Sequence, residues 1–331
     1  MQATTSKLDL TTFKIKAKRL PSDISKLRKD YKFNSSNFLT IGSNPKLEKS
    51  LKVLDIPTAA LALEPTVKAC PWATVACRQL CLHTAGNPVY LPNKIKCRNR
   101  RYTAYFNLDT RSIFLRLLII EVLRFYRKNS NKSMIAFRSN MVSDVAFEAQ
   151  PVTITKEDSQ WILDCFGINL NANTYGSIFE TLNNAYDYLK ERPIKDILYF
   201  YDYTKIPNGF NGRDYAKCKE LGLHLTLSYG GKEQVEQWLK AGVTENIFDH
   251  AARYGLNVAA AWNSVEHGKE YPELMKVYGK TYKTTSGDLT DARFLDASEL
   301  MPLLIILLIK RSKGQTEAMR QAFSINDEIE A

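Results

Sequence analysis

The stretch Asp196-Ile197-Leu198-Tyr199-Phe200-Tyr201 decides the fold, together with the run Leu223-His224-Leu225-Thr226-Leu227 that follows it. Both are short apolar runs, which predict buried strands. Residues 215–221 and 232–240 each predict a helix that stops at a glycine. Strands that alternate with helices are joined by right-handed crossovers and lie parallel in one sheet. We therefore expect an α/β fold with a partial or complete (β/α) barrel-like parallel sheet.

The alternation of strands and helices extends over much of the chain. Further strands are predicted at residues 38–41, 59–63, 134–137, 257–262 and 281–284. Further helices are predicted at residues 111–128, 154–166, 177–191 and 298–310. None of these strands is followed by a G-x-G-x-x-G or Walker glycine pattern, which argues against a nucleotide-binding open sheet.

Length and charge suggest how the chain is organised. Its 331 residues are enough for one large α/β domain. We divide the chain into a basic N-terminal arm (1–36) and a single domain (37–331) that carries a cysteine loop at 70–97. Residues 1–133 hold 25 Lys and Arg against 8 Asp and Glu, a net charge of +17, whereas the remainder carries −6. This asymmetry is typical of a surface that meets nucleic acid or phosphate, although a solvated basic face is the alternative.

Four of the six cysteines lie between Cys70 and Cys97 with the spacing C-x6-C-x3-C-x15-C. Thiolates are soft ligands that select iron–sulfur clusters, zinc or Cu(I). Lys and Arg residues flank Cys97, and their charge would stabilise a negatively charged four-iron cluster. We therefore expect a [4Fe-4S] cluster held by Cys70, Cys77, Cys81 and Cys97, with zinc as the alternative.

Two other interpretations of the cysteines need no metal. A disulfide is disfavoured because the sequence shows no signal peptide and no apolar run of the roughly 18 residues that a membrane helix needs. A cytoplasmic protein without membrane contact is the expectation. Burial in a core suits Cys165 and Cys218, which lie within apolar helical patterns.

Polar side chains follow several of the predicted strands, and function collects at the carboxyl ends of the strands in α/β folds. We expect Asp202, Lys205, Asp144 and Asp288 to act as acid, base or charge-pairing groups. We expect Arg138, Asn140, Tyr201 and Ser228 to bind a cofactor or a small anionic ligand in the same polar pocket. Helix caps and surface salt bridges are the structural alternative for each of these residues.

On these residues the chain resembles a phage-encoded family named after "gene product 88". The resemblance spans roughly residues 38–314 and rests on Gly42-Ser43-Asn44-Pro45-Lys46-Leu47, the loop from Ala69 through Cys77, Arg100-Arg101, Arg138-Ser139-Asn140 with Ser143-Asp144, Tyr201-Asp202-Tyr203-Thr204-Lys205, Asp288, and Asp291-Ala292-Arg293-Phe294-Leu295-Asp296. It implies phage origin and action in the cytoplasm of a bacterial host. It brings no known reaction with it.

The chain is also faintly similar to radical S-adenosylmethionine enzymes, which place a four-iron cluster at the end of the first barrel strand. Those enzymes use C-x3-C-x2-C and leave one iron open, whereas this chain has C-x6-C-x3-C and a fourth candidate ligand in Cys97. The expected function is an iron–sulfur protein with redox or small-substrate chemistry. A zinc-stabilised nucleic-acid-binding protein and a radical enzyme are the two alternatives.

Overall fold

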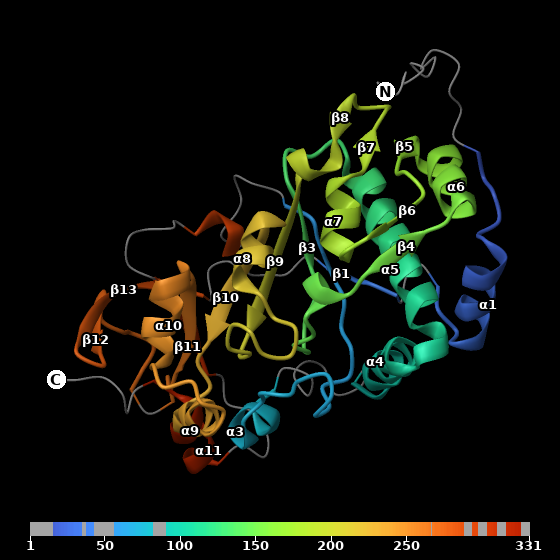
Figure 1. Cartoon of the computed structure of the whole chain (residues 1–331). Helices are drawn as coiled ribbons and strands as arrows, with labels where there is room; N and C mark the ends of the chain where they lie inside the picture. Colours follow the sequence, from blue (N-terminus) through green and yellow to red (C-terminus); the bar gives the residue numbers. More distant parts are fainter. Residues whose placement is uncertain are drawn as a thin grey trace.

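The computed structural model describes residues 16–34, 38–42, 56–81, 91–265, 267–287, 293–296, 303–309 and 316–325 (Figure 1). Within these residues the main sheet has nine strands in the order β1-β2-β3-β9-β10-β11-β14-β13-β12. In that order the strands are β1 (Thr40–Gly42), β2 (Thr58–Ala60), β3 (Ile135–Arg138), β9 (Leu198–Thr204), β10 (Leu223–Ser228), β11 (Asn257–Trp262), β14 (Leu304–Leu308), β13 (Lys280–Ser286) and β12 (Leu274–Val277).

All strands from β2 to β13 in this order run parallel, and β1 and β12 pair antiparallel at the two edges. The predicted α/β fold with a parallel sheet is therefore confirmed. Two small antiparallel sheets stand apart from it: β4 (Val152–Ile154) with β6 (Asn173–Tyr175), and β5 (Ile168–Asn169) with β7 (Tyr186–Asp187) and β8 (Arg192–Pro193). Among the described residues β1 and β12 do not pair with each other, so these strands do not close a barrel.

The α-helices of the described segments follow most of the predicted positions. They are α1 (Ser22–Asp30), α3 (Val75–Gln79), α4 (Leu91–Phe106), α5 (Leu108–Asn129), α6 (Lys156–Phe166), α7 (Ile178–Asn183), α8 (Tyr215–Glu220), α9 (Lys232–Lys240), α10 (Ile247–Tyr254) and α11 (Glu317–Phe323). Several begin at side chains that cap free backbone N–H groups. Asn107 caps α5, and Thr155 forms a capping box with Asp158 at the start of α6. No helix in the described part of the chain is long and apolar enough to cross a membrane.

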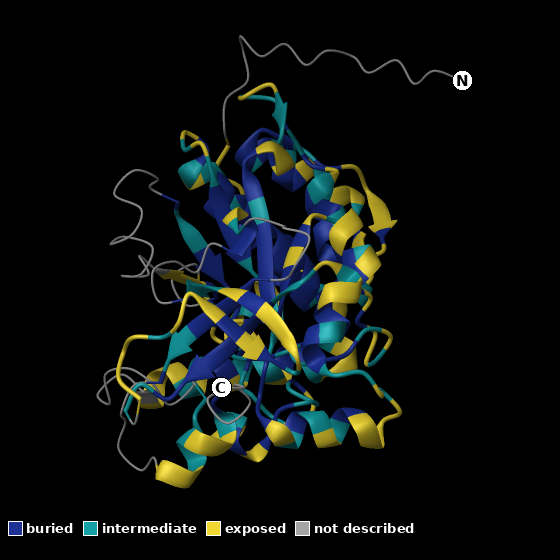
Figure 2. Cartoon of the chain, turned by 90° about the vertical axis from the view of Figure 1, so that its left-hand side faces the viewer, coloured by how far each residue is buried: buried dark blue, intermediate teal, exposed yellow. Residues whose placement is uncertain are grey.

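The main sheet has two different faces because side chains alternate along a strand. The core face carries Phe137, Phe200 and Leu225, which belong to the large buried cluster that also includes residues of α5, α7 and α10. We call the other side the tyrosine face, after Tyr199, Tyr201 and Tyr203 of β9. There Tyr199 stacks on Phe294 of a short 3-10 helix, with ring centres 4.8 Å apart. Figure 2 shows the central strands buried, and exposed residues on the outer sides of the helices and on the edge strands.

One predicted helix is wrong and a second is too long. In the stretch predicted as a helix over 298–310, the residues that the structure describes form strand β14, which pairs with β11 and β13. A continuous apolar run fits a buried helix or a buried strand equally well, and here pairing with two neighbours decides. The helix predicted over 177–191 ends at Asn183, and the chain then turns into β7.

The described part of the basic arm is folded. Ile24 and Leu27 of α1 are buried, and α1 packs against α5. Arg116 of α5 donates hydrogen bonds to Asp23 of α1 and to Asp158 of α6, which joins three helices. The boundary between an arm and a domain at residue 36 stays a prediction, because residues 35–37 lie outside the described ranges.

Candidate functional site

The carboxyl ends of β2, β3, β9 and β10 meet at the end of the molecule where α3, α9 and α11 gather (Figure 1). Parallel strands bring their carboxyl ends to one edge, so the polar residues that follow them come together. Strand β3 ends at Arg138 and is followed by Asn140 and Asp144. Strand β9 contains Asp202 and is followed by Lys205, and β10 ends at Ser228. These residues lie at the ends of neighbouring strands, and their sharing of one pocket stays a prediction. Asp288 lies outside the described residues.

Asp202 lies fully buried at the junction of β3 and β9. Its Oδ2 accepts hydrogen bonds from Ser139 Oγ and from Asn140 Nδ2, the latter at 2.7 Å. Its Oδ1 accepts from the backbone N–H of Tyr203 at 2.9 Å and lies 3.7 Å from Arg138 Nε. Burial raises the pKa of Asp202 to about 6, while the charge of Arg138 and the Ser139 hydrogen bond oppose a larger rise.

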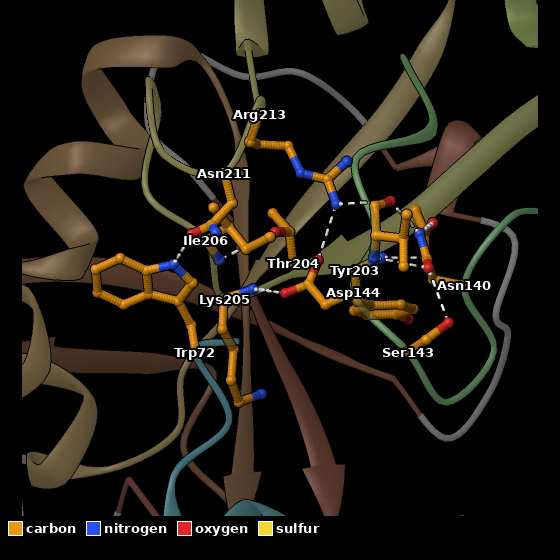
Figure 3. Close-up of polar contacts among 12 residues, drawn as sticks. Trp72, Asn140, Ser143, Asp144, Tyr203, Thr204, Lys205, Ile206, Asn211 and Arg213 are labelled. Carbon is orange, nitrogen blue, oxygen red and sulfur yellow. Dashed lines mark hydrogen bonds and ion pairs between the residues drawn. The ribbon is translucent and has the colours of Figure 1, made fainter. Parts of the chain in front are cut away.

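Asp144 connects the ends of β3 and β9 (Figure 3). Its Oδ2 accepts from the backbone N–H of Lys205 at 2.7 Å, and its Oδ1 accepts from Arg213 Nη2 at 2.8 Å. Arg213 Nη1 donates to both carboxylate oxygens of Glu148 at 2.9 Å. The Arg213 and Glu148 side chains have no exposed surface, so this is a buried ion pair that fixes Asp144 and, through it, Lys205.

Lys205 is held at both its backbone and its side chain. Its carbonyl oxygen accepts hydrogen bonds from Trp238 Nε1 at 3.2 Å and from Gln234 Nε2 at 3.4 Å. Its Nζ donates to Ser228 Oγ at 2.7 Å and lies 5.6 Å from the ring centre of Phe323 in α11. The ammonium group is thus positioned by β9, α9 and α11 together.

The first half of the cysteine loop follows β2 and docks on these strand ends. The backbone N–H of Asp144 donates to the carbonyl of Ala69 at 2.7 Å. Thr74 caps α3 at the N–H of Cys77 and also donates its hydroxyl to the carbonyl of Gly230 at 3.3 Å. Trp72 Nε1 donates to Asn211 Oδ1 at 2.7 Å (Figure 3). Residues 69–79 are therefore anchored beside Asp144 and the turn after β10.

The cysteine thiols of the described residues do not form a complete metal site. Burial raises the pKa of the Cys70 thiol, and the nearby charges of Asp144, Cys81 and Cys77 raise it further. The Cys70 Sγ donates to the carbonyl of Val142 at 3.6 Å. Among the described residues, no three His, Cys, Asp or Glu side chains converge closely enough to hold a metal ion.

Cys97 lies in α4, which is fastened to the segment between β2 and Cys70. Arg98 Nε donates to Glu64 Oε2 at 2.9 Å, and Arg101 Nη1 donates to the carbonyl of Ala62. Burial lowers the pKa of Arg101 to about 10, and the charge of the nearby Cys97 opposes a larger fall. Cys97 thus belongs to a helix that meets the segment after β2, and the role of all four cysteines as ligands stays a prediction.

The C-terminal helix α11 covers the same edge of the sheet. It packs against α3 and α9, and beyond it the N–H of Ile325 donates to the carbonyl of Ala261 at 2.9 Å. Gly231, with φ of +86°, permits this approach because a Cβ there would lie 1.9 Å from the carbonyl oxygen of Ala322. Asn263, at the end of β11, donates to Glu317 Oε1 at 3.0 Å.

Two residues that shape this site, Arg213 and Phe323, were not predicted from the sequence, whereas Glu148 was recognised as a polar residue after a predicted strand. Arg213 stands in a loop between β9 and α8, and its partners Glu148 and Asp144 are 65 and 69 residues away in sequence. No local pattern links them. The one available signal was Glu148 shortly after a predicted strand, and its partner could not be named from that.

Comparison with known protein families gives a match over most of the chain. The family model described as "Gene product 88" matches residues 34–324, which is most of the chain. No curated protein and no solved structure matches it.

Proposed function

The chain belongs to the Gene product 88 family, and from that premise we propose that it is a phage-encoded iron–sulfur protein of the bacterial host cytoplasm. It binds one [4Fe-4S] cluster at the carboxyl end of β2, beside the strand-end residues Asp144 and Lys205. The sheet serves as part of a barrel-like scaffold whose strand ends face the cluster. The bound cluster supplies redox or small-substrate chemistry.

One observation carries this proposal. The cysteine loop is fixed at the strand ends: Asp144 donates its backbone N–H to Ala69, the residue before Cys70, and also accepts the backbone N–H of Lys205. Cys77 lies in α3 and Cys81 just after it, in the segment that Thr74 ties to Gly230. A cluster there would meet soft donors from one short stretch of chain, next to a fixed cation that offsets the negative charge of a thiolate-ligated cluster.

The donor set fits a cluster in chemistry, and its geometry must tighten on binding. The thiols lie too far apart here to hold a metal ion, so Cys77 and Cys81 have to approach Cys70. Helix α3 is short, because it spans only Val75–Gln79, and Cys81 lies beyond its last residue. Adjustment of that short helix is less demanding than movement of the sheet. Cys97 enters as the fourth ligand from α4, which Arg98 ties to the end of β2.

The test is an absorption spectrum with iron, sulfide and zinc analysis on protein purified without oxygen. We expect about four irons per chain and a broad charge-transfer band that bleaches with dithionite. Cys70→Ala, Cys77→Ala and Cys81→Ala should each lose it, whereas Cys165→Ala, which alters a half-buried cysteine outside the loop, should keep it. Colourless wild-type protein without iron would refute the proposal.

A second candidate, a radical enzyme with one open iron, is favoured by a specific contact. Cys70, Cys77 and Cys81 neighbour one another, whereas Cys97 comes from a separate helix. The Gly230-Gly231 turn after β10 contacts Thr74 of the cysteine loop. In this case Cys97→Ala keeps the full cluster spectrum. Loss of the spectrum in Cys97→Ala would instead support four thiolate ligands.

The same analysis separates the zinc alternative. One tightly bound zinc without colour would indicate a structural metal site and turn attention to nucleic acid. Binding of nucleic acid would then weaken steeply with salt, since each phosphate contact releases condensed cations.

A further inference from the structure

We propose that Lys205 and Ser228 form a binding site for a small oxyanion, a carboxylate or a phosphate group, at the carboxyl end of the tyrosine face. The inference deepens the proposed function, because it names the chemical class of the molecule held next to the cluster. It rests on the proposed function only in assuming that a cluster lies next to the bound anion. The site itself is built from the described residues of β9, β10 and β3.

The ammonium group of Lys205 has a hydroxyl and a ring for neighbours. Among the described residues its Nζ contacts Ser228 Oγ and the Phe323 ring, and no carboxylate oxygen lies within ion-pair distance. The carboxylates at the same strand ends are engaged elsewhere. Asp144 accepts hydrogen bonds from Arg213 and from the backbone N–H of Lys205. Asp202 accepts hydrogen bonds from Ser139 and Asn140. A half-buried cation without a carboxylate favours an external anion.

Ser228 adds a second donor to the site. Its Oγ accepts the hydrogen bond from Lys205 Nζ at 2.7 Å. A hydroxyl has one hydrogen to donate in addition to its acceptor lone pairs, so Ser228 can turn that hydrogen toward an anion. Lys205 and Ser228 are neighbours on paired strands, since Thr204 of β9 is in register with Leu227 of β10. Two donors on adjacent parallel strands converge on one oxyanion.

The lysine is held in place before any ligand arrives. Asp144, Gln234 and Trp238 bind its backbone, and a Cβ added to Gly230 would lie 3.0 Å from its Cε. A fixed side chain loses little conformational entropy on binding, which increases affinity. The surrounding contacts therefore hold the Lys205 ammonium group in one position before a ligand binds.

A second cation lies on the same face. The Arg138 guanidinium stacks over the Tyr203 ring, 4.7 Å from its centre. Tyr203 and Lys205 are two residues apart in β9, so their side chains leave the same side of the strand. Arg138, Tyr203 and Lys205 thus make a row in which both ends are positive. Hydrogen bonds from charged donors to carboxylate or phosphate are among the stronger ones in proteins.

The neighbourhood of this row connects the anion to the cysteine loop. Asp144 accepts the backbone N–H of Lys205 and donates its own backbone N–H to Ala69, the residue before Cys70, so Lys205 and the cysteine loop meet at one carboxylate residue. An anionic substrate bound at Lys205 would lie beside the proposed cluster.

The test is calorimetric titration of anaerobically purified protein with inorganic phosphate and, separately, with acetate. We expect saturable binding of at least one of them at a single site, and the stronger of the two identifies the group. Lys205→Met should weaken binding by about tenfold or more, which corresponds to the loss of one charge-assisted contact. Ser228→Ala should weaken it less, and Lys205→Arg should restore part of it.

The matched control is Lys232→Met, which removes an exposed lysine at the first residue of α9 and should leave binding unchanged. Equal losses in Lys205→Met and Lys232→Met would show a diffuse charge effect and overturn the inference. Wild-type protein that binds neither anion would overturn it as well.

The same titration on metal-free protein separates the two proposals. Binding that depends on Lys205 in protein that never holds a cluster supports the anion site and counts against the cluster. Protein that holds a cluster but binds neither anion supports the cluster and overturns the anion site.

Discussion

Replacing Arg213 by methionine tests whether one buried ion pair holds the strand ends in place. Arg213 Nη1 lies 2.9 Å from both oxygens of Glu148, and neither side chain is exposed. Methionine fills a similar volume without charge, so the variant leaves Glu148 as a buried carboxylate without its partner. Breaking a buried pair from one side costs about 3–5 kcal/mol. We expect the free energy of unfolding at pH 8 to fall by that amount, measured by urea denaturation.

The loss should depend on pH. Burial already raises the pKa of Glu148, and Arg213 opposes that rise. Without Arg213 the folded-state pKa of Glu148 increases further, so the folded variant takes up a proton more readily than the unfolded chain. A carboxyl group with a raised folded-state pKa favours folding at low pH, and this contribution is lost as pH rises through that pKa. The cost of Arg213→Met should therefore be smaller at pH 5 than at pH 8.

Two controls make the result specific. Arg253→Met removes a side chain that is 64% exposed and whose Nη2 lies 2.9 Å from Glu245 Oε2, and it should cost less than about 1 kcal/mol at either pH. Adding Glu148→Gln to Arg213→Met should recover part of the lost stability at pH 8. A cost for Arg213→Met no larger than that of Arg253→Met, or one that is equal at both pH values, would refute this reasoning.

Two further predictions concern Asp202 and Gly231. Because the folded-state pKa of Asp202 is about 6, above its ordinary value of 3.8, stability present below about pH 4 is lost as pH rises to 6. Urea titrations should show wild type losing up to about 3 kcal/mol relative to Asp202→Asn over that range, and parallel pH profiles would contradict this assignment. Gly231→Ala places a Cβ against Ala322, so hydrogen exchange in residues 316–325 should speed up. Gly242→Ala, at the nearly identical φ of +87° but with open space around it, should leave that exchange unchanged.

Local patterns predicted many elements correctly because their causes are local. Helix α9 spans Lys232–Lys240 as expected, and α5 lies within a few residues of its predicted range. Helix α6 begins close to residue 154, the first residue of its predicted range, because the hydroxyl of Thr155 satisfies a nearby backbone N–H. The strands β10 and β11 also lie where short apolar runs between glycine-bounded helices placed them.

The errors fall where local patterns are ambiguous. The apolar run at 303–309 gave no sign of its partner strands, and β14 lies between β11 and β13 rather than in chain order. Residues 184–191 were predicted to continue a helix, and pairing with Ile168 and Arg192 made β7 instead. The pairings of β14 with β11 and β13, and of β7 with β5, join residues far apart in sequence, whereas β7 and β8 form a local hairpin.

The candidate site shows the same division. Sequence identified the cysteine spacing, the strand-end polar residues and the family, since side-chain chemistry and the carboxyl-end rule for parallel sheets need no coordinates. It could not identify Arg213 as the partner of Glu148 and Asp144, nor place Phe323 over Lys205. Those contacts join residues 65 to 118 positions apart, which only packing of the whole chain brings together. Residue types and local spacing thus determined which side-chain chemistries the chain carries, and long-range packing determined which of these side chains come into contact.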